Sequence, residues 1–270
     1  MKKNLRIALA QLSVTKGNIR ANLQKHIELI ELAAEQHANV IVFPELSLTG
    51  YEPDLLEELA FTSSDESVLA LSRLATYHNM VIVCGLPLQN ENEAGETQGK
   101  PYIAAAIFQP SRTVSFYRKQ YLHEGEAAFF ARGKDNVMLS VKGNKLALAI
   151  CADFSHPQHA KDAQDAGADI YLVSALISQN GYEHDSELLA DIAQTHRFPV
   201  LLSNFVGETG GWETAGQNRV WDVNGSQSEK GCTTLNGILL CSLTGNEVLS
   251  SQFHLGTAKP IVEEPLTPTV

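Results

Sequence analysis

The chain has 270 residues, a formal net charge of −11 and a hydrophobic fraction of 44%. This length suffices for one large α/β domain whose core needs no disulfide or metal to hold it together. The acidic balance, with no run of lysines and arginines, argues against nucleic acid and anionic membranes as partners, because both are bound through clustered positive charge.

The first segment, MKKNLRIALAQLSV, is expected to form a strand rather than a secretion signal. Gln11 and Ser13 interrupt its apolar run, and no small-residue cleavage site follows. No apolar run approaches the roughly 18 residues that a membrane span requires. The cysteines are scattered, which is typical neither of a disulfide framework nor of a metal site, and this predicts a reducing, cytoplasmic location. They are Cys84, Cys151, Cys232 and Cys241.

Apolar runs bounded by turn residues predict strands along the chain, several of them buried on both faces. In chain order these are 5–12, 39–45, 80–88, 102–108, 113–117, 145–151, 169–174 and 199–204. Helical periodicity predicts helices at 18–38, 66–79, 157–166 and 183–197, with Asn18 as the N-cap of the first. The early alternation of strand and helix predicts an α/β fold.

Gly-containing turns change the pattern later in the chain. The segments VKGNKL (141–146) and DVNGSQ (222–227) each place such a turn between apolar segments, which predicts hairpins and therefore a mixed sheet. Hairpin-like runs over 218–254 indicate a second sheet or a second half of the same layered domain. We expect a single domain over residues 1–258, followed by an extended C-terminal tail over 259–270.

Glu45 directly follows a predicted strand in VIVFPELSLTGY (40–51). Open α/β sheets place their active sites at the carboxyl ends of strands, and Pro44 ends the ladder, so Glu45 is expected to point into a crevice. Taken alone, a solvated loop carboxylate remains the commoner interpretation.

Lys119 follows another predicted strand, inside the aromatic-rich segment SFYRKQYLHEGEAAFF (115–130). Long loops inside compact domains tend to be functional. A lysine held there among carboxylates such as Glu45 and Glu126 could stabilise developing negative charge. A solvated pair of Arg118 and Lys119 fits the same segment equally well.

Cys151 ends the apolar run KLALAIC (145–151). A thiol becomes nucleophilic when a neighbouring base or positive charge favours the thiolate, and the amide of Ala152 could help to bind an oxyanion. By spacing alone, an inert buried cysteine stays open as the alternative.

The order Glu, Lys, Cys at three strand ends resembles the nitrilase, or carbon–nitrogen hydrolase, superfamily, in its amidase-like branch. FPELSLTGY is similar to the family's glutamate motif, YRKQYL to its lysine motif and ICADFSHP to its cysteine motif. Glu126 lies seven residues after Lys119, as in family members. The segment SNFVGETGGWETAGQNRVWDVNGS (203–226) extends the match past residue 220.

The resemblance implies a four-layer αββα sandwich with two mixed β-sheets, forming a homodimer or a higher homo-oligomer. It implies that Glu45 is the general base, that Cys151 attacks an amide carbonyl and that Lys119, with the amide of Ala152, holds the oxyanion. Glu126 would orient Lys119 and the substrate. Further supporting or substrate-binding positions implied by the match are Tyr51, Asp153, Ser174 and Ala175.

The substrate is expected to be a small aliphatic amide or ω-amide, hydrolysed to a carboxylate and ammonia without a cofactor or a metal. The residues between Asp153 and Pro157 depart from the common family ending, so an N-carbamoyl-amine hydrolase or a nitrilase using the same triad remains an alternative. So does a catalytically silent binding or assembly member of the fold. His156 and His159 also leave open a Cys–His thiol hydrolase or a metal site.

Overall fold

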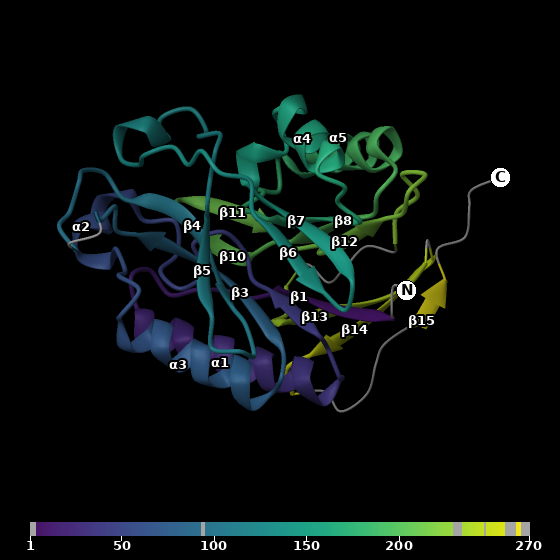
Figure 1. Cartoon of the computed structure of the whole chain (residues 1–270), viewed down its shortest axis with the longest axis horizontal. Coiled ribbons are helices and arrows are strands. Elements are labelled where there is room, and N and C mark those ends of the chain that lie inside the picture. Colours follow the sequence, from purple (N-terminus) through teal and green to yellow (C-terminus); the bar gives the residue numbers. More distant parts are fainter. Residues whose placement is uncertain (1–3, 93–94, 229–233, 246, 257–262, 266–270) are drawn as a thin grey trace.

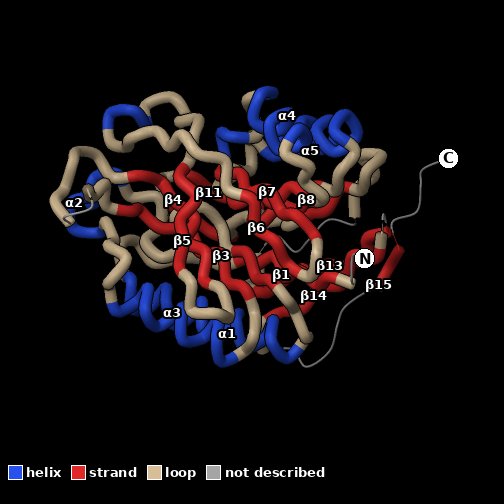
Figure 2. Tube along the Cα trace, in the orientation of Figure 1, coloured by secondary structure: helices blue, strands red, loops and turns tan. Residues whose placement is uncertain are grey.

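Two β-sheets stack face to face in the computed structural model, and helices cover the outer face of each sheet (Figure 1). The structure describes residues 4–92, 95–228, 234–245, 247–256 and 263–265. Coloured by secondary structure, the molecule shows helices below, strands through the middle and helices above (Figure 2). The predicted αββα sandwich, a single α/β domain with mixed sheets, is confirmed.

The larger sheet carries eight strands within the described residues, in the order β15-β14-β13-β1-β2-β3-β4-β5. The pairs β1–β2 and β2–β3 are parallel and the remaining pairs are antiparallel. The strands are β1 (Leu5–Gln11), β2 (Val40–Val42), β3 (Val81–Leu88), β4 (Tyr102–Phe108), β5 (Val114–Arg118), β13 (Gly237–Thr244), β14 (Glu247–His254) and β15 (Glu263–Pro265).

The smaller sheet has the order β12-β9-β8-β7-β6, with β7, β8 and β9 parallel and an antiparallel strand at each edge. A separate two-stranded ribbon joins β10 to β11 across a Gly-Gly turn. The strands are β6 (Met138–Val141), β7 (Asn144–Ile150), β8 (Ile170–Ser174), β9 (Val200–Ser203), β10 (Val206–Thr209), β11 (Trp212–Ala215) and β12 (Arg219–Trp221).

The helices α1 and α3 lie against the larger sheet, whereas α4 and α5 lie against the smaller one (Figure 1). Asn18 caps α1 as predicted, since its side chain accepts a hydrogen bond from the Ala21 amide at 3.0 Å. The α-helices are α1 (Ile19–Glu35), α2 (Leu56–Leu59), α3 (Glu66–Tyr77), α4 (Pro157–Asp165) and α5 (Tyr182–His196). Short 3₁₀ turns are η1 (Pro53–Leu55), η2 (Glu126–Ala128) and η3 (Cys151–Asp153).

The alternation of side chains along β1 shows why its sequence is apolar without a break from Ile7 to Ala10. Ile7 and Leu9 are buried between the two sheets, while Ala8 and Ala10 are buried beneath α1 and α3. A strand covered on both faces has no solvent side on which to place polar residues. The large side chains thus fill the space between the sheets, and the small ones lie beneath the helices.

The later part of the chain differs from the predicted hairpins in two ways. The turn at 222–227 is followed by a single bridge between Trp221 and Gln227 rather than by a second strand. The hairpin β13–β14 extends the larger sheet beside β1 instead of forming a sheet of its own. In the predicted tail, residues 263–265 pair with β14, whereas 259–262 and 266–270 lie outside the described residues, so the boundary at 258 stays a prediction.

Candidate active site

Three strands of the two stacked sheets are followed by the predicted catalytic residues Glu45, Lys119 and Cys151. Glu45 follows β2, Lys119 follows β5 and Cys151 follows β7, so the larger sheet supplies two of the side chains and the smaller sheet the third. The Lys119 Nζ donates to Glu45 Oε1 at 2.7 Å and to Glu126 Oε1 at 2.9 Å. Glu45 and Cys151 line the same pocket, and Cys151 influences the pKa of the Glu45 carboxyl group. The structure therefore brings the three predicted groups and Glu126 into one cluster.

The loop that carries Glu45 is pressed against β3. A Cβ atom at Gly85 would lie 2.3 Å from the Pro44 carbonyl oxygen and 2.4 Å from the Leu46 nitrogen, so only glycine allows this approach. From the other sheet, Ser174 Oγ donates to the Phe43 carbonyl at 2.5 Å. These contacts fix the backbone on either side of Glu45, whose side chain is 1% exposed.

Lys119 is fully buried and its backbone is held on both sides. Its amide donates to the Ile103 carbonyl at 2.9 Å, and its own carbonyl accepts from the Gly133 amide at 2.8 Å. A Cβ atom at Gly133 would lie 2.2 Å from the Arg118 carbonyl oxygen. The aromatic-rich loop that begins at Lys119 therefore returns to Lys119 at Gly133, and this contact holds the lysine backbone in place.

Cys151 opens η3 in a left-handed backbone conformation, with φ of +42°. Residues other than glycine hold such a conformation only where the surrounding structure enforces it, and they are concentrated at functional sites. The side chain is partly buried, and Sγ donates to the Leu176 carbonyl at 3.6 Å. The strand β7 thus delivers the thiol on a tight turn at the carboxyl edge of the smaller sheet.

The electrostatics of the cluster suit a base beside a protonated thiol. Burial raises the pKa of Glu45 to about 7, with Glu126 adding to the rise, while the charge of Lys119 opposes it. Burial and the Glu45 charge raise the pKa of Cys151 well above its ordinary value, although Lys119 acts against this. Burial acts to lower the pKa of Lys119, but Glu45, Cys151 and Glu126 outweigh it and the pKa is raised. The resting state near neutral pH therefore contains a thiol, an ammonium and a carboxyl group poised to exchange a proton.

Asp153 joins the turn of Cys151 to the loop that begins at Lys119. Its Oδ1 accepts from the amides of Gln120 at 3.0 Å and Tyr121 at 2.8 Å. Its Oδ2 accepts from the Ile150 amide at 2.9 Å and from Tyr117 Oη at 2.6 Å. Asp153 is fully buried and positions backbone on both sides of the site, rather than lining the pocket.

His159 belongs to a buried chain of hydrogen bonds that ends at Asp153. Tyr171 donates to His159 Nδ1 at 2.6 Å, His159 Nε2 donates to Tyr117 Oη at 2.8 Å, and Tyr117 donates its one proton to Asp153. Burial lowers the pKa of His159, which fits this neutral tautomer. His156 stacks on Tyr121 at 4.1 Å between ring centroids. Both nitrogens of His159 are occupied by tyrosines, which disfavours the Cys–His and metal alternatives.

A pocket of about 350 Å³ opens onto the cluster. Of the predicted residues it is lined by Glu45, Tyr51, Glu126, Cys151 and Ala152. Tyr51 donates to Glu126 Oε1 at 2.9 Å, and the His123 amide donates to Glu126 Oε2 at 2.7 Å. Phe154 and Ser155, in the stretch between Asp153 and Pro157 that departs from the common family ending, also line it. The remaining lining residues were not named as site residues from the sequence, and they are His123, Leu176, Ile177, Ser178, Gly181, Asp185 and Trp212.

Ser174 and Ala175 are not among the residues that line this pocket. Ser174 is buried and bonds to the Phe43 carbonyl, while the Ala175 amide donates to the Ser203 carbonyl at 3.0 Å. The chain reaches the pocket slightly later, at Leu176, after β8 has ended. The sequence thus pointed to the correct end of β8, but the two residues selected there do not line the pocket.

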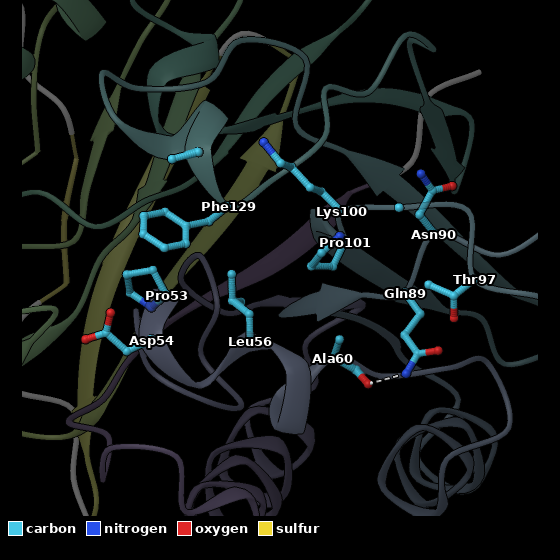
Figure 3. A pocket seen from close by; sticks show the side chains of 12 residues that line it. Pro53, Asp54, Leu56, Ala60, Gln89, Asn90, Thr97, Lys100, Pro101 and Phe129 are labelled. Carbon is cyan, nitrogen blue, oxygen red and sulfur yellow. Dashed lines mark hydrogen bonds between the residues drawn. The ribbon is translucent and has the colours of Figure 1, made fainter.

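A second, larger hollow of about 780 Å³ lies beside η1, α2 and η2 (Figure 3). Pro53, Leu56 and Phe129 form apolar parts of its wall, and Lys100 lies at its edge with its amine donating to the Ala127 carbonyl at 2.7 Å. None of Glu45, Lys119 and Cys151 lines it. The chemistry-bearing side chains therefore belong to the smaller pocket.

Residues 6–240 match the model of the carbon–nitrogen hydrolase family. A match over most of the chain, with this fold and this cluster, shows that the chain belongs to the carbon–nitrogen hydrolase family. No helix within the described residues is long and apolar enough to span a membrane.

The relatives of this chain include glutamine-dependent NAD(+) synthetases and an amidase. The glutamine-dependent NAD(+) synthetase of Thermotoga maritima is 29% identical over 179 residues, covering 64% of this chain and 30% of the relative. The chain spans between 30% and 38% of the length of the synthetases it matches. The 2-oxoglutaramate amidase of Bacillus subtilis is 27% identical over 218 residues, covering 80% of this chain and 82% of the relative.

Solved structures agree on the architecture. The amidase from Nesterenkonia sp. AN1 superposes with a TM-score of 0.79 at 24% identity, covering 89% of this chain and 93% of the other. A mutant of that amidase, with a TM-score of 0.78 and 25% identity over 88% of this chain and 90% of the other, carries the acetamide moiety of fluoroacetamide covalently added at its active site cysteine.

Proposed function

We propose that this protein hydrolyses a small aliphatic amide or ω-amide to a carboxylate and ammonia through a thioester on Cys151. The observation that carries the proposal is that one buried carboxylate, Glu45, is bonded to the Lys119 ammonium and lines the same pocket as the Cys151 thiol. The amidase relatives support this reaction class.

In the first half of the reaction, Glu45 takes the thiol proton as Cys151 Sγ bonds to the amide carbon. The carbonyl oxygen becomes an oxyanion, which the Lys119 ammonium and the Ala152 amide stabilise. When the carbonyl reforms, the C–N bond breaks and Glu45 returns the proton to the leaving nitrogen, which departs as ammonia. A carboxyl group with a pKa of about 7 can both accept and return this proton near neutral pH.

In the second half, a water molecule replaces ammonia beside Glu45. The carboxylate takes a proton from the water as its oxygen bonds to the thioester carbon, and Lys119 again faces the oxyanion. The C–S bond then breaks, the carboxylic acid product forms, and the proton returns to the sulfur. Glu126 holds Lys119 in place through its 2.9 Å contact, and it accepts a hydrogen bond from the Tyr51 hydroxyl.

The test is ammonia release from butyramide by the wild-type protein, Cys151→Ala and a matched control, Cys241→Ala, which removes a buried thiol from the core. We expect turnover by the wild type and the control and none by Cys151→Ala, with all three folded by circular dichroism. A panel that adds a nitrile and an N-carbamoyl amine tests the alternatives. Preferred turnover of either compound would reject the amidase assignment.

The family resemblance also predicts a homodimer or a higher oligomer. We propose that two copies associate through a helix face, since α4 and α5 cover one outer surface of the sandwich (Figure 1). Sedimentation velocity measures this directly, and a monomer at micromolar concentration would reject it.

A further inference from the structure

Asp185 lines the active-site pocket from the first turn of α5. Within the described part of the chain its carboxylate makes no hydrogen bond or ion pair, although it is only partly exposed. Burial raises the pKa of Asp185, while His184 and His123 act in the opposite direction. A half-buried carboxylate with no donor from the protein keeps its acceptor capacity for water or for a ligand in the pocket.

An acidic residue in the first turn of a helix has an ordinary explanation, because it complements the helix dipole. Glu183, the second residue of α5, also complements the helix dipole, and it is exposed to solvent. Asp185 differs because its carboxylate lies against the pocket wall. Its Oδ2 is 3.7 Å from the position that a Cβ atom at Gly181 would occupy, and Gly181 lines the pocket as well.

The charge around the pocket is unbalanced. Three carboxylates line it, those of Glu45, Glu126 and Asp185, and its described lining contains no arginine or lysine. The buried Lys119 is bonded to Glu45 and Glu126, which leaves the Asp185 charge without a lysine partner. The pocket therefore favours a positively charged group near Asp185 and disfavours a negative one.

An aromatic side chain in the lining of the same pocket points to the same chemistry. Trp212 lines the pocket, is 45% exposed and packs against Tyr51 with 5.5 Å between ring centroids. A partly exposed indole attracts an ammonium group, and a carboxylate in the lining of the same pocket adds to that attraction. Both features come from elements far from Cys151 in the sequence.

We propose that Asp185 determines substrate choice: it binds an ammonium group at the end of the substrate remote from the scissile amide, and it repels a carboxylate there. The substrate class is then the ω-amino amide rather than the ω-amide of a dicarboxylic acid. This inference rests on the proposed function, because it assumes that an amide carbon reaches Cys151 in the same pocket.

Three amides of equal length test the charge preference, namely 5-aminopentanamide, pentanamide and glutaramate. For the wild-type protein we expect kcat/KM for the cationic amide to exceed that for the anionic amide by at least about tenfold. Asp185→Asn is expected to reduce this ratio by about tenfold, and Asp185→Glu to preserve the preference. The matched control is Asp191→Asn, the same change at an exposed position of the same helix, which should leave the ratio unchanged.

An unchanged ratio in Asp185→Asn, or a wild-type preference for glutaramate, would overturn the inference while leaving the amidase function intact. If the wild-type protein hydrolyses none of the three amides, the proposed function fails. Calorimetric binding of the same compounds to Cys151→Ala, with and without Asp185→Asn, then decides the charge preference separately. Cation-selective binding that Asp185→Asn abolishes supports the role of Asp185, and equal binding of all three compounds overturns it.

Discussion

Lys119 Nζ lies 2.7 Å from Glu45 Oε1, and the two side chains are 0% and 1% exposed. The proposed oxyanion donor and the proposed general base are thus hydrogen-bonded to each other before a substrate arrives. A buried pair of this kind is costly to break from one side, because the remaining charge has neither a partner nor water. Function and stability are therefore coupled at this contact.

The first prediction follows from that coupling. Lys119→Met is expected to abolish ammonia release and to lower the free energy of unfolding by about 3–5 kcal/mol, because Glu45 and Glu126 lose their common cation. The double variant Lys119→Met/Glu45→Gln should recover part of that stability and none of the activity. Urea denaturation measures the free energy of unfolding of both variants, and ammonia release measures their activity. Additive losses in the double variant would show that the two side chains are energetically independent.

The second prediction concerns the backbone of Cys151. A folded protein is normally less stable with glycine than with alanine at the same position, but φ of +42° at Cys151 reverses this order. Cys151→Gly should unfold with a free energy about 1 kcal/mol higher than Cys151→Ala. Both variants should be inactive. A lower stability for the glycine variant would mean that the turn is not strained.

The third prediction is a dependence on pH. Because the pKa of Glu45 is raised to about 7, its base form is lost as the pH falls through 7, and kcat/KM for an amide should fall with it. A carboxyl group whose folded-state pKa is raised contributes stability below its unfolded pKa, near 4.5, and that contribution is lost as the pH rises through about 7.

Glu45→Gln removes this ionisation. The difference in unfolding free energy between pH 5 and pH 8 should therefore be smaller in Glu45→Gln than in the wild type. Glu28→Gln, an exposed change in α1, serves as the control and should keep the wild-type difference. An equal change in unfolding free energy between pH 5 and pH 8 in the wild type and in Glu45→Gln would contradict a raised pKa at this residue.

The fourth prediction tests the buried chain that ends at Asp153. Tyr117→Phe leaves the His159 Nε2 proton without its acceptor and removes one donor from Asp153, which should cost about 1–3 kcal/mol. We expect kcat to fall more than KM changes, since the network positions Cys151 and Lys119 without lining the pocket. Tyr77→Phe, at a side chain that is 83% exposed, should leave stability and kinetics unchanged. A KM effect alone would place Tyr117 in substrate binding instead.

The architecture could be predicted from the sequence because the central strands are near-continuous apolar runs and the long helices α1 and α3 each have one apolar stripe. The three strand ends could be predicted for the same reason, since an abrupt change from apolar residues to Glu45, Lys119 or Cys151 is visible in the chain. The family resemblance identified them as one set, and the structure shows that they meet.

The remaining features of the site depend on packing between elements distant in sequence. Trp212 and Asp185 reach the pocket from β11 and α5. Trp212 stands in the segment 203–226 that is similar to the family, but no local feature of the sequence marks either residue as part of the pocket. Asp153 and His159 were visible as residues, but their shared partner Tyr117 lies on the other sheet. Local sequence signals describe elements, whereas these contacts arise only when the two sheets stack.

The central claim is the covalent intermediate on Cys151, and rapid acid quenching during butyramide turnover tests it most directly. Peptide mass spectrometry of the quenched enzyme should find a butyryl group on the peptide that contains Cys151, formed and lost at rates that match ammonia release. Ammonia release by an enzyme whose Cys151 never carries the acyl group, or full turnover by Cys151→Ala, would contradict the account.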